Sequence, residues 1–172
     1  MAGFSEIFNP MQTVLVSSRG SSSQPHLRQR KDGDIDNIMA IDWHMPVSFK
    51  PALYAISVGK TRFSFGIIES SKVFAVNFMP AEKRDAILFC GRKTGATTDK
   101  FHDSGLTKLE CSSIDCPRIK EACAFLECEV VNEIEEGDHV IFIGKVLNGE
   151  ILNLEKRAFH LRDDDFTTTE EI

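Results

Sequence analysis

Two long segments of strand-forming residues, 124–133 and 139–148, are separated by Glu135-Glu136-Gly137-Asp138. A glycine followed by an aspartate between two such runs is typical of a tight reversal, so the segments predict a β-hairpin. A connection this short allows only antiparallel pairing, because parallel strands need a crossover of a dozen or more residues. The hairpin therefore commits at least this part of the chain to an antiparallel sheet.

Runs of β-branched and aromatic residues predict further strands at 11–17, 35–43, 53–59 and 72–78. Helices are expected at 63–70, from Pro80 to Gly91 and over 98–104, with a helical turn at 119–122. No strand alternates regularly with a full-length helix, which argues against a doubly wound nucleotide-binding fold. The pattern predicts a mainly β protein, an antiparallel β-barrel with peripheral helices.

The 172 residues predict a single domain over 1–172, long enough to bury a core without disulfides or metals. Residues 18–34 are rich in serine, glycine and charge and predict a long loop. Three aspartates and three threonines near the end predict a flexible tail over about 162–172.

The net charge of −6, with no basic stripe, argues against a nucleic-acid partner. No window approaches 18 consecutive apolar residues, so no membrane span is expected. Five cysteines, an odd number without a signal peptide ahead of them, predict a cytoplasmic protein in a reducing environment.

The run from Asn37 to Pro51 holds the single tryptophan, Trp43, in a short segment closed by two prolines. A side-chain amide and successive backbone N–H groups can bind an anion. A bent edge strand with a half-buried tryptophan explains the same residues, and the segment alone leaves both interpretations open.

Residues 90–100 form a loop rich in glycine and threonine with three cations, leading into a helix. Such a loop suits a phosphate, although it lacks the spacing of a Walker motif. A solvated connection capped by Thr97 or Thr98 is the alternative.

The spacings Cys111-x4-Cys116 and Cys123-x4-Cys128 are wider than the usual zinc or cluster pairs, and no His-x3-His pair occurs. No metal site is therefore predicted. His139 opens a strand directly after the Gly-Asp turn, and by spacing alone it is a hairpin-end residue without a role.

Four segments in order resemble the flavin reductase-like family of FMN-binding split β-barrels, most closely its flavoredoxin-type branch, over about residues 9–150. They are Asn37-Ile-Met-Ala-Ile-Asp-Trp43, Arg62-Phe63-Ser64 with Glu69 and Phe74-Ala-Val-Asn77, Cys90-Gly91 through Asp99-Lys100-Phe101, and Glu127-Cys128 with Gly137-Asp138-His139. Ser64 stands where the family usually has threonine, a change that keeps the hydroxyl.

The resemblance implies a six-stranded antiparallel split barrel, a homodimer that builds the cofactor site, and non-covalent FMN. His139 would approach the flavin as the catalytic residue, and Lys100 would neutralise the phosphate. The other cofactor-binding residues implied by the resemblance are Asn37, Met39, Ala40, Ile41, Asp42, Trp43, Ser64, Thr94 and Gly95.

The function implied is that of an FMN-binding flavoprotein, a flavoredoxin-like electron carrier or reductase, and thus an oxidoreductase with NAD(P)H or a redox protein as partner. One alternative is an NAD(P)H-dependent reductase that supplies reduced FMN to a partner enzyme. A second is a non-catalytic barrel that binds FMN or another protein.

Overall fold

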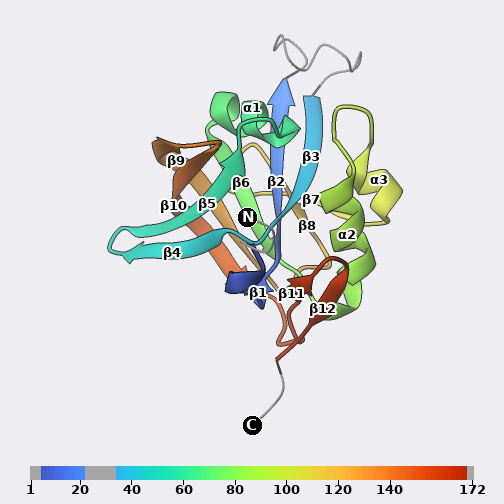
Figure 1. Cartoon of the computed structure of the whole chain (residues 1–172). Coiled ribbons are helices and arrows are strands. Elements are labelled where there is room, and N and C mark those ends of the chain that lie inside the picture. Colours follow the sequence, from blue (N-terminus) through green and yellow to red (C-terminus); the bar gives the residue numbers. More distant parts are fainter. Residues whose placement is uncertain (1–4, 22–33, 170–172) are drawn as a thin grey trace.

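The computed structural model describes residues 5–21 and 34–169 (Figure 1). Its strands are β1 (Met11–Gln12), β2 (Val14–Ser21), β3 (Asp34–Ile41), β4 (His44–Phe49), β5 (Ala52–Gly59), β6 (Val73–Phe78), β7 (Lys108–Glu110), β8 (Pro117–Ile119), β9 (Ala124–Glu136), β10 (His139–Ile151), β11 (Phe159–Arg162) and β12 (Asp165–Thr167). The helices are η1 (Ser5–Phe8), α1 (Phe63–Ser71), η3 (Ala81–Lys83), α2 (Arg84–Arg92) and α3 (Lys100–Ser104). The predicted mainly β, antiparallel architecture is confirmed.

Seven strands form the main sheet of the described residues, in the order β3-β2-β6-β9-β10-β5-β4. Its two edge strands, β3 and β4, follow each other in the chain and are joined only by Asp42 and Trp43. The sheet must therefore curl until its edges nearly meet, and the Trp43 carbonyl accepts a hydrogen bond from the Ser57 N–H of β5 at 2.9 Å. The result is an open barrel of seven strands, where the resemblance implied six, because β4 adds to the edge of β5.

The predicted hairpin of β9 and β10 is present and longer than its sequence signal, with 13 residues in each strand. Gly137 sits in its turn at φ 60°, a left-handed conformation that glycine adopts without strain. The pairing shifts register beside Gly144, where an added Cβ would lie 2.7 Å from Cζ of Phe74. Glycine at this position makes room for that ring inside the barrel.

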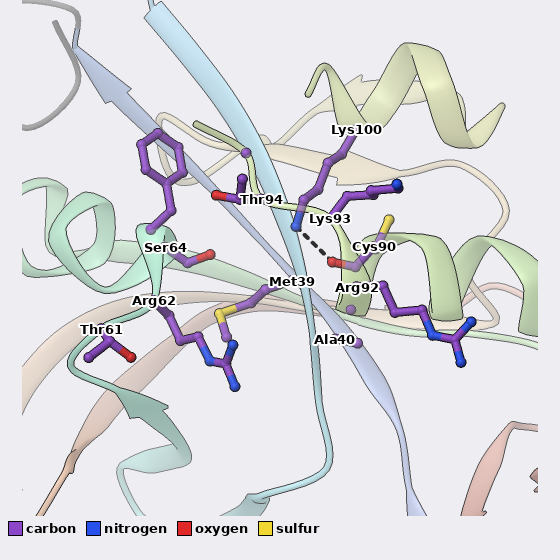
Figure 2. A pocket seen from close by; sticks show the side chains of 13 residues that line it. Met39, Ala40, Thr61, Arg62, Ser64, Cys90, Arg92, Lys93, Thr94 and Lys100 are labelled. Carbon is purple, nitrogen blue, oxygen red and sulfur yellow. Dashed lines mark hydrogen bonds between the residues drawn. The ribbon is translucent and has the colours of Figure 1, made fainter. Parts of the chain in front are cut away.

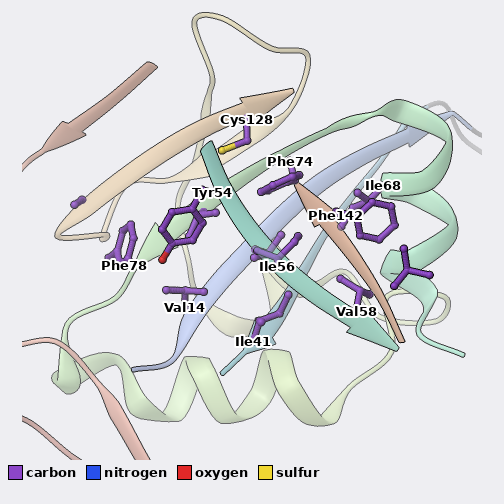
Figure 3. Packing of buried hydrophobic residues seen from close by; sticks show 14 residues of the cluster. Val14, Ile41, Tyr54, Ile56, Val58, Ile68, Phe74, Phe78, Cys128 and Phe142 are labelled. Carbon is purple, nitrogen blue, oxygen red and sulfur yellow. The ribbon is translucent and has the colours of Figure 1, made fainter. Parts of the chain in front are cut away.

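The barrel interior is a buried apolar cluster contributed by β2, β3, β5, β6, β9, β10 and α1 (Figure 3). Phe74 and Phe142 lie at its centre, and both are fully buried. Alternate residues of β2 divide between two cores, because Val14 and Val16 point inward while Leu15 points outward.

The outward face of β2 and β3 is covered by α2 and α3, which lie side by side along β3 in Figure 1. Ile38 of β3 packs there with Ile87 of α2 and Phe101 of α3. This second core fixes α2, α3 and the loop between them against the middle of β3.

The structure corrects the predicted boundaries around β2. The strand expected at 11–17 is interrupted at Thr13, whose N–H donates to the Ala158 carbonyl at 3.1 Å, and it then continues to Ser21. The loop expected at 18–34 is therefore shorter at both ends, and residues 22–33 lie outside the described part.

Residues 117–119 form strand β8, and a turn follows it at the predicted place, 119–122, where the Ala122 N–H donates to the Ile119 carbonyl at 3.4 Å. The N–H of Ile119 donates at 2.8 Å to Oδ1 of Asn77, a fully buried side chain of β6, and this contact favours the extended conformation.

Near the end of the chain β11 and β12 form a hairpin, and β11 pairs with β1. Its second strand lies within the tail that the sequence predicts to be flexible, and that flexibility stays a prediction. No helix in the described ranges is long and apolar enough to cross a membrane.

Candidate functional site

A pocket of about 260 Å³ opens between the start of α1, the middle of β3 and the segment from the end of α2 to α3 (Figure 2). Its floor is Met39 and Ala40 of β3. The remaining lining residues come from two walls: Thr61, Arg62, Phe63 and Ser64 on one side, and Cys90, Gly91, Arg92, Lys93, Thr94, Gly95 and Lys100 on the other. Three segments far apart in sequence thus meet at one site.

The first wall presents the N-terminus of α1. Arg62 is the N-cap residue, in an extended conformation, and no side chain caps the helix. The first N–H groups of a helix have no intrahelical partner and carry the positive end of its dipole. The Phe63 and Ser64 end of α1 therefore offers backbone donors to an anion in the pocket.

Four cations line the same pocket: Arg62, Arg92, Lys93 and Lys100. Arg92 also forms an ion pair with Asp164. Guanidinium and ammonium groups around uncapped helix donors are the arrangement that binds a phosphate most strongly. The electrostatics of the pocket thus favour a multiply charged anion.

Lys100 is only 4% exposed. Its Nζ donates to the carbonyl oxygens of Ile38 and Cys90, each at 2.7 Å, and the second bond is drawn in Figure 2. An ammonium has three N–H donors, so one remains for the pocket that Lys100 lines. Burial lowers the pKa of Lys100 to about 8, which leaves the side chain mostly protonated at neutral pH.

Asn37 lies beside the pocket and joins its two walls. Its Nδ2 donates to Oγ of Ser64 at 2.6 Å, while its Oδ1 is buried without a hydrogen-bond partner. Gly95 packs directly on that oxygen, since an added Cβ there would lie 2.0 Å from Oδ1. A buried acceptor left unpaired is costly, and this one lies directly beside the cationic pocket.

Trp43 and His139 lie apart from the pocket lining. Their rings pack against each other with centroids 5.0 Å apart, and His139 Nδ1 is 2.7 Å from Oδ1 of Asp138. Trp43 also lines a groove of about 390 Å³ whose other residues are Phe8, Met11, His44, Met45, Ala55, Ile56, Ser57 and Ile141. This groove is almost entirely apolar.

Gly59 lies between the cationic pocket and the Trp43–His139 pair. A Cβ on Gly59 would lie 3.5 Å from Cγ of Arg62 and 3.5 Å from Nε2 of His139. The cationic pocket and the Trp43–His139 pair therefore adjoin across this glycine.

His44, in the groove wall, is held neutral. Its Nε2 faces the Gln12 carbonyl at 2.8 Å, so that nitrogen carries the proton, and Nδ1 accepts from the Tyr54 hydroxyl at 2.6 Å. Burial lowers the pKa of His44 and raises the pKa of Tyr54 to about 12, so neither group charges the groove at neutral pH.

The sequence-predicted site residues thus separate into three sets. Met39, Ala40, Ser64, Thr94, Gly95 and Lys100 line the pocket, with Asn37 at its edge. Trp43 and His139 form the neighbouring pair. The side chains of Ile41 and Asp42 serve the fold: Ile41 is buried in the barrel core, and Asp42 accepts from Thr13 and from Nδ1 of His160.

Seven lining residues are not among the predicted cofactor-binding residues, namely Thr61, Arg62, Phe63, Cys90, Gly91, Arg92 and Lys93. Two signals were present. Arg92 and Lys93 directly precede the predicted Thr94 and Gly95, and Arg62 directly precedes the predicted helix.

A family model described as "Flavin reductase like domain" matches residues 8–168. An uncharacterised protein of Archaeoglobus fulgidus is 36% identical over 112 residues, which is 65% of this chain and 63% of that protein. The chain thus spans less than two thirds of that relative.

Solved structures share the fold at low identity. An FMN-binding protein from Thermus thermophilus with bound 1-cyclohex-2-enone superposes with a TM-score of 0.81 at 19% identity, covering 98% of this chain and 90% of that one. Flavoredoxin of Desulfovibrio vulgaris superposes with a TM-score of 0.81 at 20% identity, covering 95% and 89%. These likenesses confirm the predicted split-barrel fold, and the family model confirms the flavin reductase-like resemblance.

Proposed function

Because the chain belongs to the flavin reductase like domain family, we propose that it binds FMN non-covalently and acts as a flavoredoxin-like electron carrier or reductase. The observation that carries this proposal is the cationic pocket at the uncapped start of α1, adjoining an apolar groove. FMN combines a phosphate with a flat apolar ring system, and the two places match its two ends.

In this proposal the phosphate lies among Arg62, Lys93 and Lys100 and accepts from the first N–H groups of α1. Asn37 and Ser64 then lie on the ribityl side, where the hydrogen bond from Asn37 orients the Ser64 hydroxyl. The backbone of 39–43 runs between the pocket and Trp43, consistent with the linear shape of the ribityl chain.

The ring system lies against Trp43 and His139 in this proposal. Bound flavin would accept and donate the electrons, so the protein's part is to orient the ring and to supply or remove protons. Nδ1 of His139 lies 2.7 Å from Oδ1 of Asp138, so the other ring nitrogen, Nε2, remains to hold or move a proton near the flavin ring. The apolar lining of the groove would pack against one face of the ring.

Rapid mixing with NADH and NADPH separates the two functions that share this site. The flavin-loaded protein is mixed anaerobically with each nucleotide, and loss of the visible flavin absorption is followed. Fast reduction by either nucleotide assigns a reductase, whereas slow reduction by both assigns an electron carrier served by a redox protein. Purified protein that neither shows flavin absorption nor takes up added FMN contradicts the proposal and leaves a non-flavin interaction barrel.

We also propose that the protein forms a homodimer and that it is located in the cytoplasm. The edge strand β4 exposes Met45, Val47 and Phe49, the last of them 96% exposed. Such a row of apolar side chains on an edge strand, which has a partner strand on one side only, is a common protein interface. The cysteines of the described residues are all free, which is consistent with a reducing compartment. Light scattering of the eluting protein tests the dimer, since a monomer at all concentrations contradicts it.

The affinity for FMN is expected to fall as the pH rises above about 8. The phosphate is dianionic from about pH 7 upward, so its charge is constant there. It favours protonated Lys100, whose pKa in the free protein is about 8, and binding above that pH must therefore take up a proton. The dissociation constant should rise by up to about tenfold per pH unit above pH 8.

Fluorescence titrations from about pH 7 to 9 measure this dependence. The control is Lys100→Met, which keeps a long side chain and removes its charge. This variant should bind FMN more weakly at pH 7, and its affinity should not change with pH. A variant with the same pH dependence as the unsubstituted protein would remove Lys100 from the phosphate site.

A further inference from the structure

We propose that Cys111 and Cys116 form a redox-active dithiol, which closes to a disulfide when the protein meets a hydroperoxide and reopens under thiol reductants. The two residues flank the loop 112–115 at the closed end of the β7–β8 hairpin. They lie outside the flavin site, and the inference is independent of the proposed function.

The hairpin register brings the two cysteines opposite each other. Glu110 pairs with Pro117, and the Cys111 N–H donates to the Cys116 carbonyl at 3.0 Å, so the two are the next facing pair. Facing residues of an antiparallel ladder have Cα atoms about 4.5–5.5 Å apart, within the range that a disulfide spans. Burial and a hydrogen bond with the Cys111 thiol raise the pKa of Cys116, so the two side chains meet.

Buried contacts hold both ends of this loop in place without a covalent bond. Oγ of Ser17 donates to the Pro117 carbonyl at 2.6 Å, and Sγ of Cys116 lies 3.2 Å from the Ser17 carbonyl. At the other end the N–H groups of Ser112 and Ser113 donate to Glu127, whose side chain is 1% exposed. The sulfurs are therefore positioned for closure with little movement of the backbone.

The two thiols differ in access. Cys111 is partly exposed, whereas Cys116 is fully buried beneath it. Within the described ranges no group of three or more histidine, cysteine, aspartate or glutamate side chains is arranged to hold a metal. An oxidant thus reaches Cys111 first, with Cys116 placed as the resolving thiol.

The chemistry balances with one equivalent of hydrogen peroxide. The Cys111 thiolate attacks one peroxide oxygen, the O–O bond breaks, and the departing hydroxide takes up the thiol proton to leave a sulfenic acid and water. The Cys116 sulfur then displaces the hydroxyl from that sulfenic acid, and its proton leaves with it as a second water. Two sulfurs have lost two electrons, and the two peroxide oxygens have gained them.

The test is peroxide treatment of the folded full-length protein, followed by alkylation, trypsin digestion and mass spectrometry. Cleavage after Lys108 and Arg118 releases one peptide, 109–118, that contains both cysteines. We expect most of this peptide to lack two hydrogens, a loss of about 2 Da that dithiothreitol reverses. Cys116→Ser should stop at a sulfenic acid on Cys111 that is trapped by dimedone, and Cys111→Ser should leave Cys116 reduced.

Cys123→Ser is the matched control, because Cys123 is buried in the other pair of the same spacing, and its variant should oxidise like the unsubstituted protein. The inference is overturned if peptide 109–118 stays reduced or if Cys111 passes directly to sulfinic acid while Cys116 is intact. It is also overturned if the disulfide joins a different pair of cysteines.

Discussion

Gly95→Ala is expected to weaken FMN binding by about thirtyfold, equivalent to about 2 kcal/mol, within the range measured for overpacking a close contact. The new Cβ would lie 2.0 Å from Oδ1 and 2.7 Å from Cγ of Asn37, and 3.0 Å from Cδ1 of Phe63. All three atoms belong to the rigid walls of the pocket, so the loop carrying Lys93 and Thr94 must move away from β3. The phosphate donors of the two walls would then no longer converge.

Titration of the purified variant with FMN, followed by quenching of flavin fluorescence, measures this loss. Gly91→Ala is the matched control, since it lines the same pocket but its new Cβ meets only Cβ of Ala40, at 3.3 Å. Its dissociation constant should stay within about threefold of the unsubstituted value. Equal affinities of the two variants would place the phosphate somewhere other than this pocket.

Phe74→Ala is expected to lower the free energy of unfolding by about 3–5 kcal/mol, the usual cost of emptying a buried phenylalanine site. The side chain is fully buried at the centre of the barrel core (Figure 3), and the space beside Gly144 is shaped around its ring. Because the surrounding strands are tied by sheet hydrogen bonds, they cannot collapse to fill the cavity.

Urea unfolding followed by circular dichroism gives the change in free energy. Val131→Ala on β9 is the control, because Val131 is 52% exposed and its truncation should cost less than about 1 kcal/mol. A loss below about 1 kcal/mol for Phe74→Ala would mean that the barrel interior is not packed around this ring.

Local patterns predicted much of the fold because they arise from local physics. The Gly137-Asp138 turn fixes the β9–β10 hairpin, and Gly91 and Gly105 lie where α2 and α3 end or nearly end. Local patterns do not predict the strand order, because β3 and β4 are neighbours in the chain yet lie at opposite edges of the sheet. The curl that results depends on all seven strands together.

The same distinction explains the errors. Strand β8 at 117–119 was not predicted, because the buried amide of Asn77 on β6, which binds the Ile119 N–H and favours a strand, is distant in sequence. That contact spans 42 residues of sequence. The sequence around Pro117 therefore cannot reveal the contact with Asn77.

The candidate site was predicted in part for a related reason. Motifs identified Asn37, Ser64, Gly95 and Lys100 without placing them, and the fold brings them to one pocket. Arg62 was missed because its side chain belongs to the site only through the path of the chain from Gly59 into α1. Conversely, Asp42 lies in the motif, but its carboxylate binds Thr13 and His160, two residues that only the folded chain brings to it.

A comparison of FMN with riboflavin tests the central claim most directly. The two ligands share the ring and the ribityl chain and differ only in the phosphate, so the ratio of their dissociation constants isolates the cationic pocket. With several charged and backbone donors on the phosphate, FMN should bind at least about a hundredfold more tightly, about 3 kcal/mol. Equal affinity for both ligands, or binding of neither, would contradict the assignment of this pocket to the FMN phosphate.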